Sequence, residues 1–331
     1  MNESLRKFLR LETEIPPKVF PAPLFIAGCM RSGTSLLVDK ISQHPQLLKI
    51  GMELNDIWSA IGEAPCVGYC MHRDESHASF SAATNMAHYF DRFIADAKSG
   101  RRYLMRVSNL FRFGSGAFSY DWDHLIPVNK SPHLTNKLRY IHTLFPQSKI
   151  VLIIRSIEGH CASTKVFFDR EYELLKRINY IPQDPKGCYT RFSEDITPEG
   201  VIPDRCYPGD FSVIPEMWIR LNALGLRDLL SLPEDSVRII SYEDLVNRQS
   251  EVLGKLFDFL DLNPAHHNHS EKIKTSGLKV INTSTSGDPL KKWKKHLSDQ
   301  ELATINQTIE NFRPDYDFIT QSLNEKNILA L

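Results

Sequence analysis

The chain has 331 residues, a length that holds one large domain or two ordinary ones. Its 40 Lys and Arg residues balance its 40 Asp and Glu residues, so no overall charge points to a nucleic acid or an anionic membrane as a partner. With 42% hydrophobic residues and no apolar run near the roughly eighteen residues of a membrane span, the composition predicts a soluble globular protein.

The N-terminal residues and the cysteines predict a cellular compartment. Residues 1–20 contain no long apolar core and are interrupted by charges, which disfavours a secretory signal. Six cysteines in a chain of this length predict no disulfide framework. Cys66 and Cys70 are close together, but no second pair and no nearby His-x-x-x-His completes a zinc site. We therefore expect structural thiols, no metal site and a reducing, cytoplasmic location.

The first predicted elements alternate between strands and helices. Residues 24–28 form a short apolar run that predicts a buried strand, and residues 34–44 carry apolar side chains at helical spacing up to a His-Pro pair. Residues 131–144 predict a second helix with Pro132 in its first turn. Lys149–Ile154 ends in an apolar run typical of a strand buried on both faces of a parallel sheet.

The alternation continues toward the C-terminus. Helices are predicted at residues 158–168, 215–230, 249–260 and 298–312, and a further strand at residues 236–241. This order predicts an α/β fold in which a parallel sheet is flanked by helices on both faces, in a single domain over residues 1–331. Residues 55–123 and 169–214 break the rhythm, and the second of these segments is rich in Pro, Gly and aromatic residues.

The sequence GCMRSGTS at residues 28–35 is close to G-x-x-x-x-G-K-[ST], the loop that binds nucleotide phosphates. Gly28, Gly33 and Ser35 fit the pattern, but Thr34 replaces the lysine that reaches the terminal phosphates. Between a strand and a helix, the backbone N–H groups of such a loop still bind an anion. Because Arg31 adds a charge inside the loop, we expect a nucleotide with one short anionic chain.

Arg155 predicts a second anion site. It follows the strand at Lys149–Ile154, where a nucleotide hydrolase needs an aspartate for magnesium. An arginine at the C-terminal end of a parallel strand lies at the edge of the sheet where ligands bind. Ser163 stands eight residues further on, about two helical turns away, so that a guanidinium and a hydroxyl meet a second phosphate. Two such sites favour a nucleotide phosphorylated at both ends of its ribose.

These motifs resemble those of sulfotransferases that use 3′-phosphoadenylyl sulfate (PAPS). CMRSGTSLL is similar to the family's 5′-phosphosulfate loop, and the segment from Arg155 to Ser163 is similar to its 3′-phosphate motif. The block Asn-Lys-Ser-Pro at residues 129–132 is similar to the segment that joins the two motifs in glycan and tyrosyl-protein sulfotransferases, although Asn129 replaces an acidic residue that is common there. Lys292 and Trp293 resemble the family's last cofactor loop.

The resemblance implies a donor, a product and a set of site residues. It implies PAPS as the donor, 3′,5′-adenosine bisphosphate (PAP) as the product, an acceptor hydroxyl and no metal. It implies that Lys130 stabilises charge on the bridging oxygen and that Glu53 takes the acceptor's proton. The implied nucleotide-binding residues are Arg31, Ser32, Gly33, Thr34, Ser35, Leu36, Arg155, Ser163 and Lys292. Arg31 also counts as a catalytic residue, because its guanidinium can hold the 5′-phosphate and stabilise charge there.

Two other functions stay open on the sequence alone. One is a kinase-like nucleotide phosphotransferase, and the other is a nucleotide-binding protein without catalysis. A melting-temperature response to ATP with magnesium would favour the phosphotransferase, and a Glu53 remote from the phosphate end of the nucleotide would favour the binding protein. If Glu53 is an ordinary surface acid, His133 is the next candidate base. His160, inside the 3′-phosphate segment, faces either the solvent or the nucleotide.

The acceptor is expected to be a sugar, a lipid-linked compound with a hydroxyl or another small metabolite, and the sequence predicts no oligomeric state. We expect residues 55–123 and 169–214 to wall the acceptor pocket, because loops at the ligand edge of a sheet carry specificity. The aromatic residues that they would supply are Trp58, Tyr69, Phe80, Tyr172, Tyr180, Tyr189 and Phe192.

Overall fold

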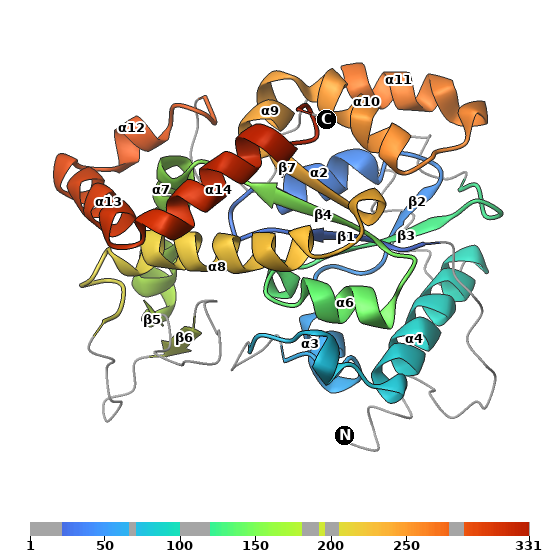
Figure 1. Cartoon of the computed structure of the whole chain (residues 1–331), viewed down its shortest axis with the longest axis horizontal. Coiled ribbons are helices and arrows are strands. Elements are labelled where there is room, and N and C mark those ends of the chain that lie inside the picture. The colour runs from blue at the N-terminus through green and yellow to red at the C-terminus, as the bar shows by residue number, and fades with distance from the viewer. Residues whose placement is uncertain are drawn as a thin grey trace.

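A computed structural model describes residues 22–65, 71–99, 120–180, 192–195, 205–277 and 288–330. Its centre is a sheet of five strands in the order β2-β3-β1-β4-β7 (Figure 1). The strands are β1 (Leu24–Ala27), β2 (Leu47–Lys49), β3 (Ile126–Lys130), β4 (Lys149–Ile154) and β7 (Val237–Ser241). Every neighbouring pair is parallel, so the C-terminal ends of all five strands meet at one edge. The predicted parallel α/β fold is confirmed.

The sheet is buried on both faces because β1 is entirely apolar and β4 is apolar from Ile150 onward. In β1, Phe25 and Ala27 belong to one core, while Leu24 and Ile26 belong to the other. The second core is completed by α2 (Thr34–Ile41), α9 (Tyr242–Asn247), α10 (Gln249–Phe259) and α11 (His267–Thr275). In Figure 1 these helices lie above the sheet.

The opposite face of the sheet packs on a larger set of helices. These are α3 (Asn55–Ala60), α4 (Phe80–Lys98), α6 (Leu138–Leu144), α7 (Ile157–Leu175) and α8 (Val213–Leu230), and α3, α4 and α6 lie below the sheet in Figure 1. Two C-terminal helices, α13 (Asp299–Asn311) and α14 (Arg313–Lys326), add Ile305 and Ile319 to this core. A separate antiparallel pair is formed by β5 (Arg177–Tyr180) and β6 (Phe192–Asp195).

Several predicted element bounds are wrong. Residues 131–144 form two elements, the 3-10 turn η3 (Pro132–Leu134) and α6, because the Ser131 hydroxyl accepts the His133 N–H and starts a separate short turn. Helix α2 ends at Ile41, before the His-Pro pair, and α7 runs on to Leu175. Residues 55–123 are not a simple break in the rhythm, since they contain the 19-residue helix α4.

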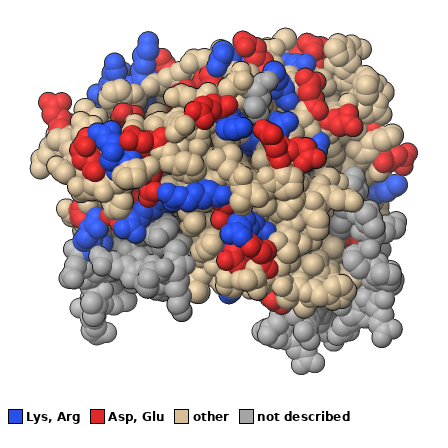
Figure 2. All heavy atoms as spheres, viewed as in Figure 1, with Lys and Arg blue, Asp and Glu red and all other residues tan. Residues whose placement is uncertain are grey.

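The surface carries both signs of charge. Figure 2 shows Lys and Arg interspersed with Asp and Glu over the face in view, as expected from a chain with a formal net charge of zero. Among the helices of the described ranges, none is long and apolar enough to cross a membrane.

Candidate active site

The loop after β1 is held in a conformation that only glycine adopts without strain at two positions. Gly28 has φ +151° and Gly33 has φ +98°. A side chain at Gly33 would also meet the Tyr242 ring, since an added Cβ lies 2.4 Å from the ring carbon Cδ2. Gly28 N–H donates to the Thr135 hydroxyl at 2.9 Å, which ties the loop to the neighbouring strand connection. The glycine spacing in the sequence therefore reflects close packing as well as chain reversal.

The first turn of α2 leaves donors for an anion. Its N-cap is Gly33, and no side chain caps the backbone N–H groups there. The positive end of a helix with uncapped N–H groups attracts negative charge. The hydroxyl of Ser32 is fully buried beside it and has no hydrogen-bond partner among the described residues. The predicted phosphate loop thus has the donors that its proposed role requires.

Arg155 lies at the end of β4 with only 9% of its surface exposed. Its guanidinium stacks 4.5 Å from the centroid of the Tyr242 ring and donates to the carbonyls of Arg31 (3.3 Å) and Pro289 (3.1 Å). The third donor position, Nε, is buried without a hydrogen-bond partner in the described structure. The Trp218 indole donates to the Arg155 carbonyl at 2.9 Å and fixes the backbone at this point.

Arg31 connects the two predicted phosphate motifs. Its Nε donates to the Ser163 hydroxyl at 3.2 Å, so its side chain turns from the loop toward α7. Burial, and then the neighbouring charge of Arg155, lower the pKa of Arg31. Burial also lowers the pKa of Arg155, although Tyr242 and Glu243 oppose this. A buried guanidinium and a half-buried one beside it make a strong site for an anion.

Lys292 lies beside the same cluster. It precedes the short helix α12 (Trp293–His296), and burial together with the charge of Arg155 lowers its pKa. Because Pro289 accepts a hydrogen bond from Arg155, the segment that begins at Asp288 packs against the end of β4. The structure therefore brings Lys292 to the predicted 3′-phosphate motif from the other end of the chain.

Glu53 and Lys130 form an ion pair at the end of β3. The Lys130 ammonium donates to Glu53 Oε1 at 2.6 Å, and Asn55 donates to Glu53 Oε2 at 3.2 Å. The Ser131 hydroxyl donates in turn to the side-chain oxygen Oδ1 of Asn55 at 2.8 Å, which orients the Asn55 amide. Burial raises the pKa of Glu53, but the pairing with Lys130 and the bond from Asn55 outweigh it, so that the pKa lies below its ordinary value.

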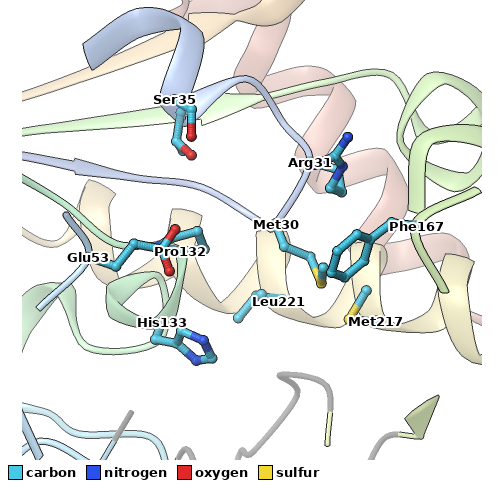
Figure 3. A pocket seen from close by; sticks show the side chains of 10 residues that line it. Met30, Arg31, Ser35, Glu53, Pro132, His133, Phe167, Met217 and Leu221 are labelled. Carbon is cyan, nitrogen blue, oxygen red and sulfur yellow. The ribbon is translucent and has the colours of Figure 1, made fainter. Parts of the chain in front are cut away.

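A pocket of about 240 Å³ joins the loop to Glu53 (Figure 3). Arg31, Thr34, Ser35 and Glu53 are the predicted site residues that line it. Lys130 does not line the pocket itself but contacts Glu53, which does. Gly33 and Arg155 lie on the other side of the loop, next to the Tyr242 ring. The side chain of Leu36 packs on the core. The other lining residues are His133, the alternative candidate base, and five residues that the sequence did not single out for this site: Met30, Pro132, Phe167, Met217 and Leu221.

Of the seven aromatic residues expected in the acceptor pocket, the three whose side chains are described lie elsewhere. Trp58 is fully buried and donates to Asn129 Oδ1 at 3.0 Å, so it belongs to the core. Phe80 is 87% exposed, and Tyr172 lies beside Lys176 on α7. Tyr69 and Tyr189, like Cys66 and Cys70, lie outside the described residues, and only the backbone is described at Tyr180 and Phe192. Described residues from 55–123 and 169–214 do not line this pocket.

His160 faces neither the solvent nor this pocket. It is fully buried, and its Nε2 lies 3.3 Å from both Cys29 Sγ and the Thr164 hydroxyl. Burial, and then the charge of Arg155, lower its pKa to about 3, so it is neutral and joins the loop to α7. Helical spacing in the sequence could have indicated some of the residues that line the pocket. Phe167 stands one helical turn after Ser163, and Met217 and Leu221 are one turn apart on α8.

Residues 23–181 match the profile of the sulfotransferase family. The match includes the loop, Glu53, Lys130, Arg155 and Ser163, while Lys292 lies beyond it.

Several sulfotransferases and a nodulation protein are similar to the chain over greater lengths. Nodulation protein NoeE of Sinorhizobium fredii (strain NBRC 101917 / NGR234) is 24% identical over 319 residues, which cover 88% of this chain and 65% of NoeE. This chain thus spans less than two thirds of that relative. Among solved structures, the sulfotransferase domain from the curacin biosynthetic pathway has a TM-score of 0.45 at 17% identity, covering 89% of this chain and 98% of the domain. Sulfotransferase STF1 from Mycobacterium tuberculosis H37Rv has a TM-score of 0.44 at 14% identity, covering 83% and 75% respectively.

Proposed function

We propose that this protein transfers a sulfuryl group from PAPS to the hydroxyl of a small acceptor. The observation that carries the proposal is the position of Arg31. It stands in a phosphate loop that lines the same pocket as Glu53, and it donates to Ser163 beside the buried Arg155. A donor with a phosphosulfate at one end of its ribose and a phosphate at the other matches two anion sites joined in this way.

The donor's groups would be held by side chains and by the backbone. Gly33, Thr34, Ser35 and Leu36 would present the N–H groups at the start of the helix to the 5′-phosphate. Ser32 would offer its hydroxyl instead, because its own N–H donates to the Cys29 carbonyl at 3.1 Å. The 3′-phosphate would take Arg155, Ser163 and, from the C-terminal segment, Lys292. The buried Nε of Arg155 and the buried hydroxyl of Ser32 fit this donor, since both lack a hydrogen-bond partner among the described residues.

Glu53 and Lys130 divide the chemistry between them. The bond between sulfur and the bridging oxygen breaks, a bond between sulfur and the acceptor oxygen forms, and PAP leaves with the electron pair. Glu53 takes the acceptor's proton, and its lowered pKa keeps it ionised and ready to do so at neutral pH. Lys130 stabilises the charge that develops on the leaving oxygen. Their ion pair holds both groups beside the pocket before the substrates bind.

The geometry favours this function over the two alternatives. A phosphotransferase of this fold needs a loop lysine, and here Thr34 takes that place with its side chain in the pocket wall. A binding protein without catalysis has no use for a base near the phosphates. Glu53 nevertheless lines the same pocket as Thr34 and Ser35.

A comparison of two nucleotides tests the proposal. PAP without magnesium should raise the melting temperature, because a ligand at 100 times its Kd adds about 2.7 kcal/mol to stability, enough for several degrees. ATP with magnesium should not. The reverse pattern indicates the phosphotransferase, and no response to either nucleotide rejects a nucleotide site of this kind.

A further inference from the structure

The pocket beside Glu53 has two chemically different sides. Figure 3 shows Glu53 and His133 on one side and Phe167 and Met217 on the opposite side, with Met30 and Leu221 between them. The first side carries a carboxylate and an imidazole. Together with Met30 and Leu221, the second side offers a ring, two thioethers and an aliphatic chain, none of which is a strong hydrogen-bonding group.

The apolar side is part of the folded core. Met217 and Leu221 lie one turn apart on α8 and are only 1% and 2% exposed, so their packing fixes them. Phe167 on α7 and Met30 in the loop are partly buried and pack against the same core. Met30 directly precedes Arg31, so the apolar side begins next to the loop that would hold the sulfuryl donor.

From these positions we infer that the acceptor is an alcohol or phenol with an apolar carbon framework. The inference rests on the proposed sulfuryl transfer. The hydroxyl of such a molecule meets Glu53, and its framework lies on Met30, Phe167, Met217 and Leu221. A sugar in the same position turns hydroxyls toward side chains that cannot replace their hydrogen bonds to water. An apolar pocket discriminates against added hydroxyls by up to about 10²-fold.

Two alcohols of matched shape test this acceptor class. Cyclohexylmethanol and methyl glucoside both carry a primary hydroxyl on a six-membered ring, but only the glucoside carries ring hydroxyls. Their Kd values are measured by calorimetry on protein saturated with PAP, and their kcat/KM values with PAPS. We expect the cyclohexyl alcohol to bind between about tenfold and 10²-fold more tightly and to be the better acceptor.

A variant on α8 locates the preference. Leu221→Asn should reduce the ratio of the two Kd values toward one while the affinity for PAP stays unchanged, and Leu230→Gln, on the exposed end of the same helix, should leave the ratio intact. Equal or tighter binding of the glucoside by the wild-type protein overturns the inference, as does a failure of the cyclohexyl alcohol to bind. If PAP itself does not bind, the proposed function fails first, so the two failures are distinguishable.

Discussion

Glu53 and Lys130 touch each other, yet their proposed roles lie on opposite sides of the transferred group. Glu53→Gln should lower turnover by roughly 10²–10⁴-fold, the usual contribution of a general base. The amide keeps the size of the side chain and can still accept from Lys130. Lys130→Ala should lower turnover by about 10²–10³-fold, the usual loss when one donor to a developing charge is removed.

A series of phenols of graded pKa separates the two defects. An acidic phenol loses its proton without help, so it should partly restore Glu53→Gln. It should not restore Lys130→Ala, whose defect lies at the leaving oxygen. Turnover of both variants is measured across the series. Wild-type rates in Glu53→Gln would show that Glu53 is not the base, and His133, in the same pocket, would be tested next.

Asn55 positions Glu53 and should set the acid limb of the pH profile. It donates to Glu53 Oε2, so Asn55→Asp replaces a donor by a like charge of the same shape. The pKa of Glu53 should rise, because two neighbouring carboxylates resist ionisation together. Since Glu53 must be ionised to accept a proton, the fall of kcat/KM toward acid should begin at higher pH. The exposed Asp56→Ala is the matched control, and an unchanged profile in Asn55→Asp would contradict this role.

At the scale of elements, the turn from β1 into α2 depends on Gly33. Gly33→Ala forces an alanine to φ +98° and drives its Cβ into the Tyr242 ring. We expect a loss of about 1–3 kcal/mol in the free energy of unfolding and loss of PAP binding, because the ring also supports Arg155. Gly254→Ala, inside α10, is the control, because a Cβ added there meets only the end of the Lys274 side chain, at 3.7 Å. Urea denaturation of both variants checks this, and equal stabilities would contradict it.

The strands and the loop could be predicted because their signals are local. The apolar run in β4 faces two cores, and the two glycines of the loop stand at fixed spacing. Helix α4 also had a local signal that was missed, since Met86, Phe90 and Phe93 fall on one buried face. The next strand in the described part of the chain is β3, which begins at Ile126, so α4 did not fit the expected alternation.

The parts of the site that were predicted wrongly depend on contacts between distant residues. Trp58 was expected in the acceptor pocket, but it is held in the core by Asn129, 71 positions away in the chain. The Glu53–Lys130 pair spans 77 positions, so the sequence suggested each residue and not their contact. The apolar side of the pocket combines the loop with α7 and α8, which no local pattern brings together.

For the whole molecule, two buried histidines predict a loss of stability in acid. His44 accepts from the Gln46 N–H and lies 3.2 Å from the Ser270 hydroxyl, and burial lowers its pKa to about 4. His160 is fully buried with a pKa of about 3. Below pH 6.5, about the ordinary pKa of a histidine, the unfolded chain binds protons that the folded protein does not. The free energy of unfolding therefore falls as pH falls, by at most about 1.4 kcal/mol per pH unit for each histidine.

Urea denaturation between pH 7.5 and 5 measures this slope. His160→Gln should remove part of it, and the exposed His267→Gln should leave it unchanged. A free energy of unfolding that does not depend on pH in the wild-type protein would contradict the burial of both imidazoles in neutral form.

The central claim is that Arg155 and its neighbours recognise a nucleotide through its 3′-phosphate. Calorimetric titration of PAP and of adenosine 5′-phosphate, which differ only in that group, tests it most directly. The wild-type protein should bind PAP more tightly by roughly tenfold to hundredfold, since a charge-assisted hydrogen bond contributes about 1.5–3 kcal/mol. Arg155→Ala should bind the two nucleotides almost equally while keeping its affinity for adenosine 5′-phosphate. Equal affinities in the wild-type protein, or equal weakening of both nucleotides in the variant, would contradict the claim.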